Sequence, residues 1–236
     1  MRLSRIFSLT VITLLSSLSC TSLFPSQSSP LLPAYHTPAA IRAHDFLSAD
    51  KHQTVHLQVT YFATHPPSIN ALNFLSKKIL KYCYKEVVTF TFTEISPLKE
   101  WPGPWTDAMI QSLEVRYAQP NPDPRAVNLH IIYLPMFNLQ APSYVAGTFD
   151  QRFIAMFHSR LVSLDNEKST LLHEFGHVLG LVNNGTPQIT PHEFSIDHPH
   201  HCGPKCAMFW QTKDDEADSD YDEECHRDLV ANGGRP

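Results

Sequence analysis

Three side chains in one apolar stretch, residues 169–183, have the types and the spacing to bind a metal ion. His173 and His177 stand four residues apart, so in an α-helix they lie on one face, one turn apart. Glu174 directly follows the first histidine. In this HExxH pattern two neutral imidazoles can hold Zn²⁺, and the carboxylate can take a proton from a water on that ion. Because burying these groups without a ligand costs free energy, we favour a metal over histidines that merely pack in a core.

This ligand set is incomplete, because a catalytic zinc needs three protein ligands and a water. Gly180 can end the helix in a left-handed turn soon after the second histidine, so the chain leaves the site there. The third ligand must therefore come from elsewhere. The chain has 14 histidines, an unusual number, and four of them fall within ten residues: His192, His198, His200 and His201.

The order of these residues resembles the metzincin zinc proteases and, among them, the archaemetzincins. Metzincins share HExxHxxGxxH followed by a turn that carries a methionine, and archaemetzincins continue with HC, a short spacer and CxM. This chain reads HEFGHVLGLVN at 173–183 and HCGPKCAM at 201–208. The resemblance covers roughly residue 127 to the C-terminus, and it makes Met208 the methionine of the turn beneath the metal.

The chain departs from that pattern in two places. Asn183 occupies the usual position of the third ligand, and the HC segment arrives only after residues 184–200. The spacer between the two cysteines of this segment is also one residue shorter than in archaemetzincins. We interpret residues 184–200 as an insertion and expect His201 to be the third ligand. His198 is the second choice, with His192 and Asp197 behind it.

Cys202, Cys206 and Cys225 resemble part of the cysteine set that holds a second, structural zinc in archaemetzincins. That family ends in CxxC, whereas Asp228 stands three residues after the last of these cysteines. A four-ligand site would therefore need a further member, and the candidates are His226, His200 and Asp228. A disulfide among the cysteines is the alternative, which export from the cytoplasm would favour. The sequence leaves both possibilities open.

The elements that must position the site follow from hydrophobic periodicity. Alternation predicts strands at 54–62 and 87–95, and the nearly continuous apolar run at 127–134 predicts a central strand. Two further strands are expected within 144–157. Helices are expected at 68–84, at 106–117 and, beginning at Asp165 or Asn166, through the two histidines. With the resemblance, this predicts an α+β metzincin-like domain in which a twisted mixed sheet is backed by helices.

The N-terminus predicts export. Basic residues, an apolar stretch at 6–15 and small residues up to Cys20 are typical of a signal peptide at 1–20, too short for a mature membrane span. A small residue before Cys20 resembles a bacterial lipoprotein site, so we expect lipidation there, with ordinary cleavage as the alternative. The protein is then expected to be membrane-anchored in the periplasm or on the cell surface, and otherwise secreted. Residues 21–50, rich in Ser and Pro, are expected to form a flexible tether, and residues 51–236 the metzincin-like domain.

Composition narrows the function classes. With 236 residues, of which 42% are hydrophobic, the chain can bury the core of one globular domain. A net charge of -5 and no basic cluster argue against a nucleic-acid partner. The resemblance implies a zinc metallopeptidase, a hydrolase of peptides or proteins, with Glu174 as the general base, and we expect a monomer. The alternative is a non-catalytic exported zinc-binding lipoprotein, which would have no need of that carboxylate.

Overall fold

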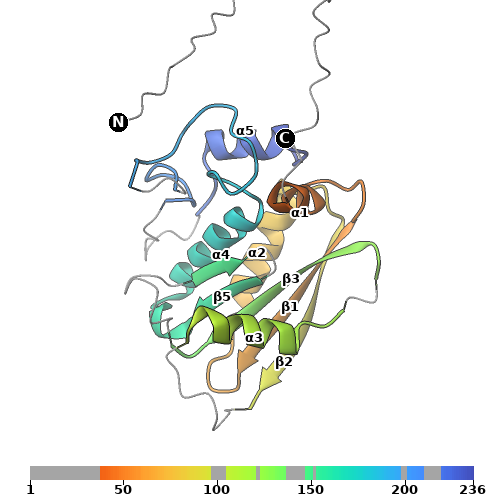
Figure 1. Ribbon diagram of the computed structural model, residues 1–236, viewed down its shortest axis with the longest axis vertical. Coiled ribbons are helices and arrows are strands. Elements are labelled where there is room, and N and C mark those ends of the chain that lie inside the picture. Colours follow the sequence, from red (N-terminus) through yellow and green to blue (C-terminus); the bar gives the residue numbers. More distant parts are fainter. Residues whose placement is uncertain are drawn as a thin grey trace, which may run out of the picture. The chain divides into compact units, whose positions relative to one another are not determined.

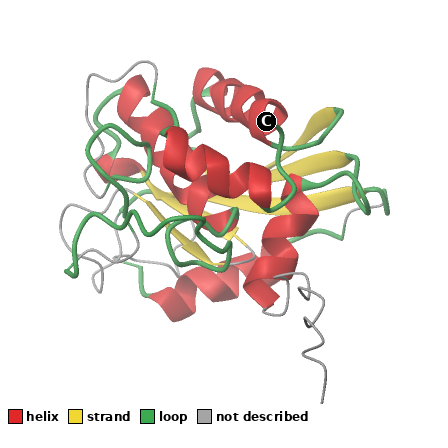
Figure 2. Ribbon diagram, turned by 90° about the horizontal axis from the view of Figure 1, so that it is seen from above, coloured by secondary structure: helices red, strands yellow, loops and turns green. Residues whose placement is uncertain are grey.

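A five-stranded sheet forms the centre of the fold (Figures 1 and 2). Its strands are β1 (Thr54–Phe62), β2 (Val87–Ile95), β3 (Ala126–Leu134), β4 (Gly147–Asp150) and β5 (Phe153–Phe157), in the spatial order β2-β1-β3-β5-β4. Strands β2, β1, β3 and β5 pair in parallel, and only β4 runs antiparallel, at the edge beside β5. The predicted mixed sheet with a central strand at 127–134 is therefore confirmed.

The fold is closer to α/β than to the predicted α+β. Parallel neighbours need crossover connections, and helices provide them: α2 (Ile69–Tyr82) joins β1 to β2, and α3 (Asp107–Tyr117) joins β2 to β3. Ser68 and Thr106 cap these helices by accepting from the backbone N–H of Ala71 and Met109, as the sequence indicated. Sequence periodicity located the elements but did not show that the strands were parallel.

The structure describes residues 38–96, 105–120, 123–136, 147–150, 153–197, 201–209 and 219–236 of this chain, in a computed structural model. The chain divides into two compact units, Met1–Leu32 and Pro33–Pro236, and all described residues belong to the second. The predicted signal peptide, Cys20 and His198 lie outside the described residues. Among the described helices, none is long and apolar enough to cross a membrane.

Helices cover both faces of the sheet (Figure 1). On one face, α2 and α4 (Leu164–Val178) bury alternate residues of β1, β3 and β5, such as Leu57, Ile131 and Ile154. On the other face, α3 packs through Ile110 and Leu113 against the intervening residues of the same strands. A 3₁₀ turn (His158–Arg160) leads from β5 toward α4, and α5 (Glu223–Ala231) follows near the C-terminus. Strands β1, β3 and β5 are therefore buried on both faces, as parallel strands usually are, whereas the edge strand β2 is largely exposed.

A helix that we did not predict, α1 (Pro38–Leu47), lies within the expected tether. Phe46 and Leu47 are fully buried, and the Phe46 ring meets the Phe175 ring of α4 edge-on at 6.0 Å. The ammonium of Lys85 donates to the main-chain carbonyl of Asp45 at 2.8 Å and to those of Ser48 and His52. A ten-residue helix gains its stability from such tertiary contacts, so its local sequence gave little sign of it.

The helix that carries the two histidines is held firmly at its N-terminal end. Ser163 caps α4, two residues before the predicted start, by accepting from the Asn166 N–H. One oxygen of Glu167 accepts from the Ser68 N–H at 3.0 Å and from the Tyr133 hydroxyl at 2.8 Å. These bonds tie α4 to the start of α2 and to the central strand, so the C-terminal half of α4 has a fixed place.

Candidate metal centres

Three imidazoles converge at the C-terminal half of α4. His173, His177 and His201 each offer one ring nitrogen, and these atoms all lie within 4.8 Å of one another. The Nε2 atoms of His173 and His177 are 3.1 Å apart. Two nitrogens bound to one tetrahedral zinc at about 2.0–2.1 Å would be about 3.3 Å apart, so the donor set fits zinc. The structure thus brings together the three histidines that the sequence singled out.

The orientation of His173 suits a metal ligand. Its Nδ1 lies 2.9 Å from the carbonyl oxygen of Ala207, and a proton on Nδ1 donated there leaves the Nε2 lone pair facing the other imidazoles. Burial is the main influence on this ring and lowers its pKa, which favours the neutral form that binds metal.

Glu174 occupies the next position of α4 and is almost fully buried. Burial raises the pKa of its carboxyl group to about 8, because a carboxylate loses its hydration there. A divalent cation nearby would favour the ionised form. The residue after the first of the three histidines therefore carries a buried carboxyl group that holds its proton more tightly than usual.

Met208 packs beneath α4 at Gly176. A Cβ atom on this glycine would lie 2.1 Å from the methionine sulfur, so only glycine admits the sulfur at that depth. Met208 is fully buried and belongs to a turn in which the Phe209 N–H donates to the Cys206 carbonyl at 3.0 Å. The predicted methionine therefore lies under the histidine helix, in a turn.

The chain leaves α4 through left-handed backbone, as the glycine in the sequence indicated. Gly180 has φ 77°, and a Cβ there would lie 2.6 Å from the main-chain nitrogen of Thr186. Asn183, at the position where the metzincin pattern has its third histidine, donates from its side chain to Glu193 at 2.7 Å. It is not part of the imidazole group.

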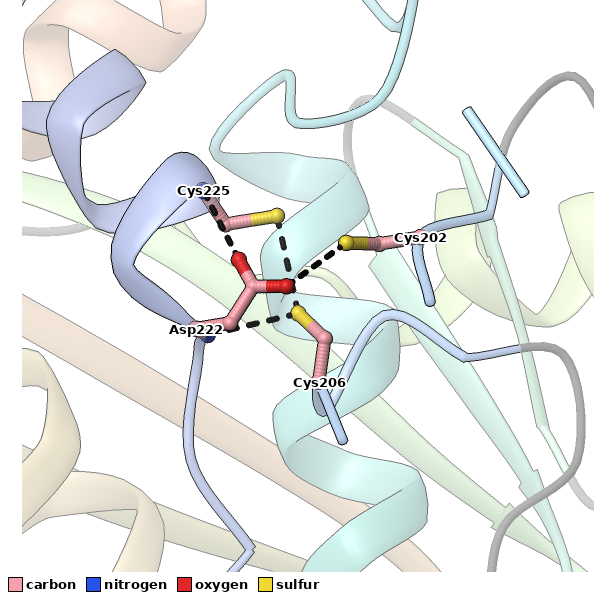
Figure 3. Close-up of side chains that lie close together, drawn as sticks. All are labelled: Cys202, Cys206, Asp222 and Cys225. Carbon is pink, nitrogen blue, oxygen red and sulfur yellow. Dashed lines mark hydrogen bonds between the residues drawn. The ribbon is translucent and has the colours of Figure 1, made fainter. Parts of the chain in front are cut away.

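A second cluster contains three sulfurs and a carboxylate (Figure 3). Donor atoms of Cys202, Cys206, Asp222 and Cys225 all lie within 4.8 Å of one another. Asp222 caps α5 by accepting from the Cys225 N–H at 3.0 Å, and its other oxygen accepts from the Cys202 thiol at 3.0 Å. We call these four residues the thiolate cluster.

The thiolate cluster fits a metal better than a disulfide. The sulfurs of Cys206 and Cys225 are 3.6 Å apart, and sulfurs bound to one tetrahedral zinc at about 2.3 Å would be about 3.8 Å apart. Cys83, Cys202, Cys206 and Cys225, the described cysteines, are all free thiols. Hydrogen bonds from Cys202 and then Cys225 lower the pKa of Cys206 to about 4. The thiolate is the form of cysteine that binds a metal.

Asp222 is a candidate ligand that sequence reasoning missed. It stands three residues before Cys225, which is the CxxC spacing with a carboxylate in place of the first cysteine. Two of the residues considered for this role bond elsewhere: His226 contacts the Arg235 carbonyl at 3.1 Å, and Asp228 accepts from the Ile189 N–H at 2.8 Å. His200 lies outside the described residues. Reading the spacing backward from Cys225 would have found the aspartate.

The segment that we interpret as an insertion, residues 184–200, contacts the C-terminal end of α5 where it is described. The Asn232 side chain donates to the Pro187 carbonyl at 3.1 Å. His192, considered above as a zinc ligand, has its Nε2 3.4 Å from the Cys225 sulfur and 3.7 Å from an Asp228 oxygen. It therefore lies beside the thiolate cluster, and Asp197, also considered, belongs to neither donor set.

One short segment, residues 201–209, joins the two donor sets. His201 belongs to the imidazole group, and its neighbour Cys202 belongs to the thiolate cluster. Ala207, whose carbonyl accepts from His173, follows Cys206 directly. The Cys202 N–H donates to the Met208 carbonyl at 2.9 Å, which closes the segment on itself.

No protein-family model matches the sequence, and no curated protein matches it. Among solved structures, the crystal structure of archaemetzincin from Methanopyrus kandleri is similar to this one, with a TM-score of 0.51 and 14% sequence identity. The similarity covers 76% of this chain and 96% of that chain. At this identity the similarity is one of fold, and it agrees with the family that the sequence resembles.

Proposed function

We propose that this chain is a zinc-dependent metallopeptidase. The observation that carries the proposal is the convergence of three imidazole nitrogens, with a buried carboxyl group in the next position of the same helix. A zinc-storage protein would need the donor atoms but not Glu174. The likeness of fold to an archaemetzincin supports the same class of activity.

The residues would divide the work as follows. His173, His177 and His201 would hold the zinc, which when bound lowers the pKa of a water and polarises the substrate carbonyl. Glu174 accepts the proton of the attacking water and passes it to the nitrogen of the leaving amine. Met208, in the role of the metzincin methionine, closes the site from below.

An extended peptide substrate would align along β4. This strand is the outer edge of the sheet, antiparallel to β5, and it packs beside α4. An edge strand offers backbone N–H and C=O groups to a further strand, and a peptide can be held by pairing with them. Recognition through the backbone would bring the scissile bond near α4 with limited dependence on side chains.

The thiolate cluster would hold a second, structural zinc. Cys202, Cys206 and Cys225 supply the sulfur ligands, and Asp222 completes a tetrahedral set. The protein would then contain one catalytic and one structural ion. A metal-to-protein ratio of two in purified protein is the expected result, and a ratio of one would remove the structural ion from this proposal.

We further propose that the protein acts outside the cytoplasm, as a monomer tethered by a lipid at Cys20. The apolar segment and small residues before that cysteine support this proposal. Mass spectrometry of the mature N-terminus tests it, because a lipidated cysteine and an ordinary cleaved terminus differ in mass.

Replacing the proposed general base tests the activity. Glu174→Gln keeps the size of the side chain but cannot accept a proton, so we expect cleavage of a peptide library to fall about 10²–10⁴-fold. Zinc content should remain that of the wild type, because the three imidazoles are intact. Cleavage by the variant at the wild-type rate would refute the mechanism.

A second variant separates metal binding from proton transfer. His201→Ala removes one ligand, so we expect it to lose both activity and the zinc of the imidazole group, whereas Glu174→Gln loses activity alone. His198→Ala is the matched control and should keep both. Loss of zinc in the control but not in His201→Ala would move the third ligand to His198.

A further inference from the structure

Asn184 lies against the ring of a proposed zinc ligand, on the side away from His173. Its side-chain amide nitrogen is 2.7 Å from Nδ1 of His177, while Nε2 of that ring faces the other imidazoles. We propose that Asn184 is a positioning residue that fixes the tautomer and the orientation of His177 for metal binding. The inference rests on the proposed function, since it concerns a ligand of the same centre.

The backbone before Asn184 is built to bring it there. Gly180, Val182 and Asn183 have φ of 77°, 51° and 63°, all in the left-handed region. That conformation is rare for a β-branched residue, and strain of this kind persists where the surroundings enforce it, often at functional sites. The side chain of Val182 is fully buried, so the strained turn is anchored in the core. As a result the chain doubles back, and Asn184 meets a ring seven residues earlier.

The chemistry of the ring defines what the amide must do. A histidine that binds metal through Nε2 carries its proton on Nδ1, and a hydrogen-bond acceptor on that side fixes the ring. The oxygen of the Asn184 amide is such an acceptor, and a half-turn of the terminal group exchanges it with the nitrogen. With the oxygen toward the ring, His177 Nδ1–H donates and Nε2 is free to bind.

The opposite orientation suits the ring without metal. With its nitrogen inward, the amide also donates to the carbonyls of Leu181 at 3.1 Å and Val182 at 3.4 Å, and His177 Nδ1 accepts. The Nε2 atom then carries the proton and cannot bind metal. With its oxygen inward, the amide loses these two bonds and its oxygen faces the carbonyls of Leu181 and Val182. Metal binding at Nε2 must offset this cost to select that orientation.

Substitutions at this position distinguish positioning from simple capping of the turn. Asn184→Asp offers only acceptor oxygens, which can hold His177 Nδ1–H but also face the carbonyls of Leu181 and Val182, so it should bind zinc at the imidazole group more tightly than Asn184→Leu. Asn184→Leu offers none and should weaken that binding about 10–100-fold. If the amide serves only as a donor to the two carbonyls, the aspartate variant should bind as weakly as the leucine variant, which would overturn the proposal.

Asn183→Ala is the matched control. Asn183 has the same residue type and a left-handed backbone, but its side chain bonds to Glu193. We expect its zinc affinity to match the wild type, and a loss equal to that of Asn184→Leu would overturn the proposal in favour of a general effect on the turn.

The zinc affinity of the imidazole group is measured by competition with a chromophoric chelator. Zinc bound by His201→Ala reports the thiolate cluster alone and is subtracted. ¹⁵N NMR of the histidine rings gives a second readout, and addition of zinc should move the His177 proton to Nδ1 in the wild type and in Asn184→Asp. Equal zinc affinity in the wild type, Asn184→Asp and Asn184→Leu would overturn the role of Asn184 but leave the proposed function standing. Tight zinc binding without peptide cleavage would overturn the proposed function alone. If Asn184→Leu does not fold, the aspartate variant and the NMR signal still decide.

Discussion

At the scale of single residues, Gly176 is the position with the least room for change. A Cβ atom there would lie 2.1 Å from the Met208 sulfur and 3.0 Å from a ring carbon of Tyr221. Alanine would raise helix propensity by about 1 kcal/mol, but overpacking a dense core costs about 1–3 kcal/mol. An approach of 2.1 Å belongs at the upper end of the overpacking range, so we expect Gly176→Ala to lower the free energy of unfolding by about 2 kcal/mol, measured by chemical denaturation.

Gly203→Ala is the control for this substitution. A Cβ atom at Gly203 would meet nothing within 4 Å, so stability should stay within about 0.5 kcal/mol of the wild type. A neutral Gly176→Ala would mean that Met208 does not fill the space beneath the helix.

The sequence predicted the part of the site whose geometry is local to one helix. The spacing of His173 and His177 fixes their common face within one helix, so no knowledge of the fold was needed. His201 came from a resemblance, since nothing local relates it to α4. Asp222 and Asn184 were missed, because their roles depend on a cap and on a strained turn that bring distant atoms together.

At the scale of elements, a buried histidine makes the central strand sensitive to pH. His130 of β3 is almost fully buried, with Nε2 2.8 Å from the Thr60 hydroxyl of β1, and burial lowers its pKa to about 4. The unfolded chain takes up the proton near pH 6.5, while the folded chain does so only near pH 4. Stability from this group is therefore full above pH 6.5, falls as the pH drops toward 4, and is constant below.

The size of the effect follows from the shift, about 3 kcal/mol at most. His130→Gln can still bond to Thr60 but cannot ionise, so its free energy of unfolding should decrease less than that of the wild type between pH 7 and pH 4. Taking the difference between the two proteins cancels the other titrating groups. Parallel curves for both proteins would show that His130 does not titrate in this way.

Elements were predictable where the pattern was long. The strands at 54–62 and 87–95 and the helices after Ser68 and Thr106 match the structure closely, because alternation and caps are local signals. The helix α1 was missed because its ten residues are stabilised by α4 and by Lys85, far away in sequence. Parallel pairing was missed for the same reason, since strand direction depends on the path of the connections.

At the scale of the whole molecule, both donor sets depend on one segment, so we expect metal binding at the two sets to be energetically coupled. Residues 201–209 supply His201, the carbonyl that orients His173, and two sulfurs of the thiolate cluster. An ion that holds Cys202 and Cys206 in place also holds their chain neighbours, His201 and Ala207. Binding at one set should strengthen binding at the other by the same factor, because coupling free energies are reciprocal.

Removing one sulfur tests this coupling. Cys225 is on α5 and contributes nothing to the imidazole group, yet Cys225→Ser should weaken zinc binding by the histidines about 10-fold, within the usual range of coupling. Cys83→Ser is the control: Cys83 is equally buried but outside the thiolate cluster, so its replacement should leave that affinity unchanged. Equal affinities in both variants would show that segment 201–209 keeps its shape without the second ion. A loss of zinc affinity at the imidazole group in Cys225→Ser, but not in Cys83→Ser, would mean that metal binding at the thiolate cluster helps to position the histidines.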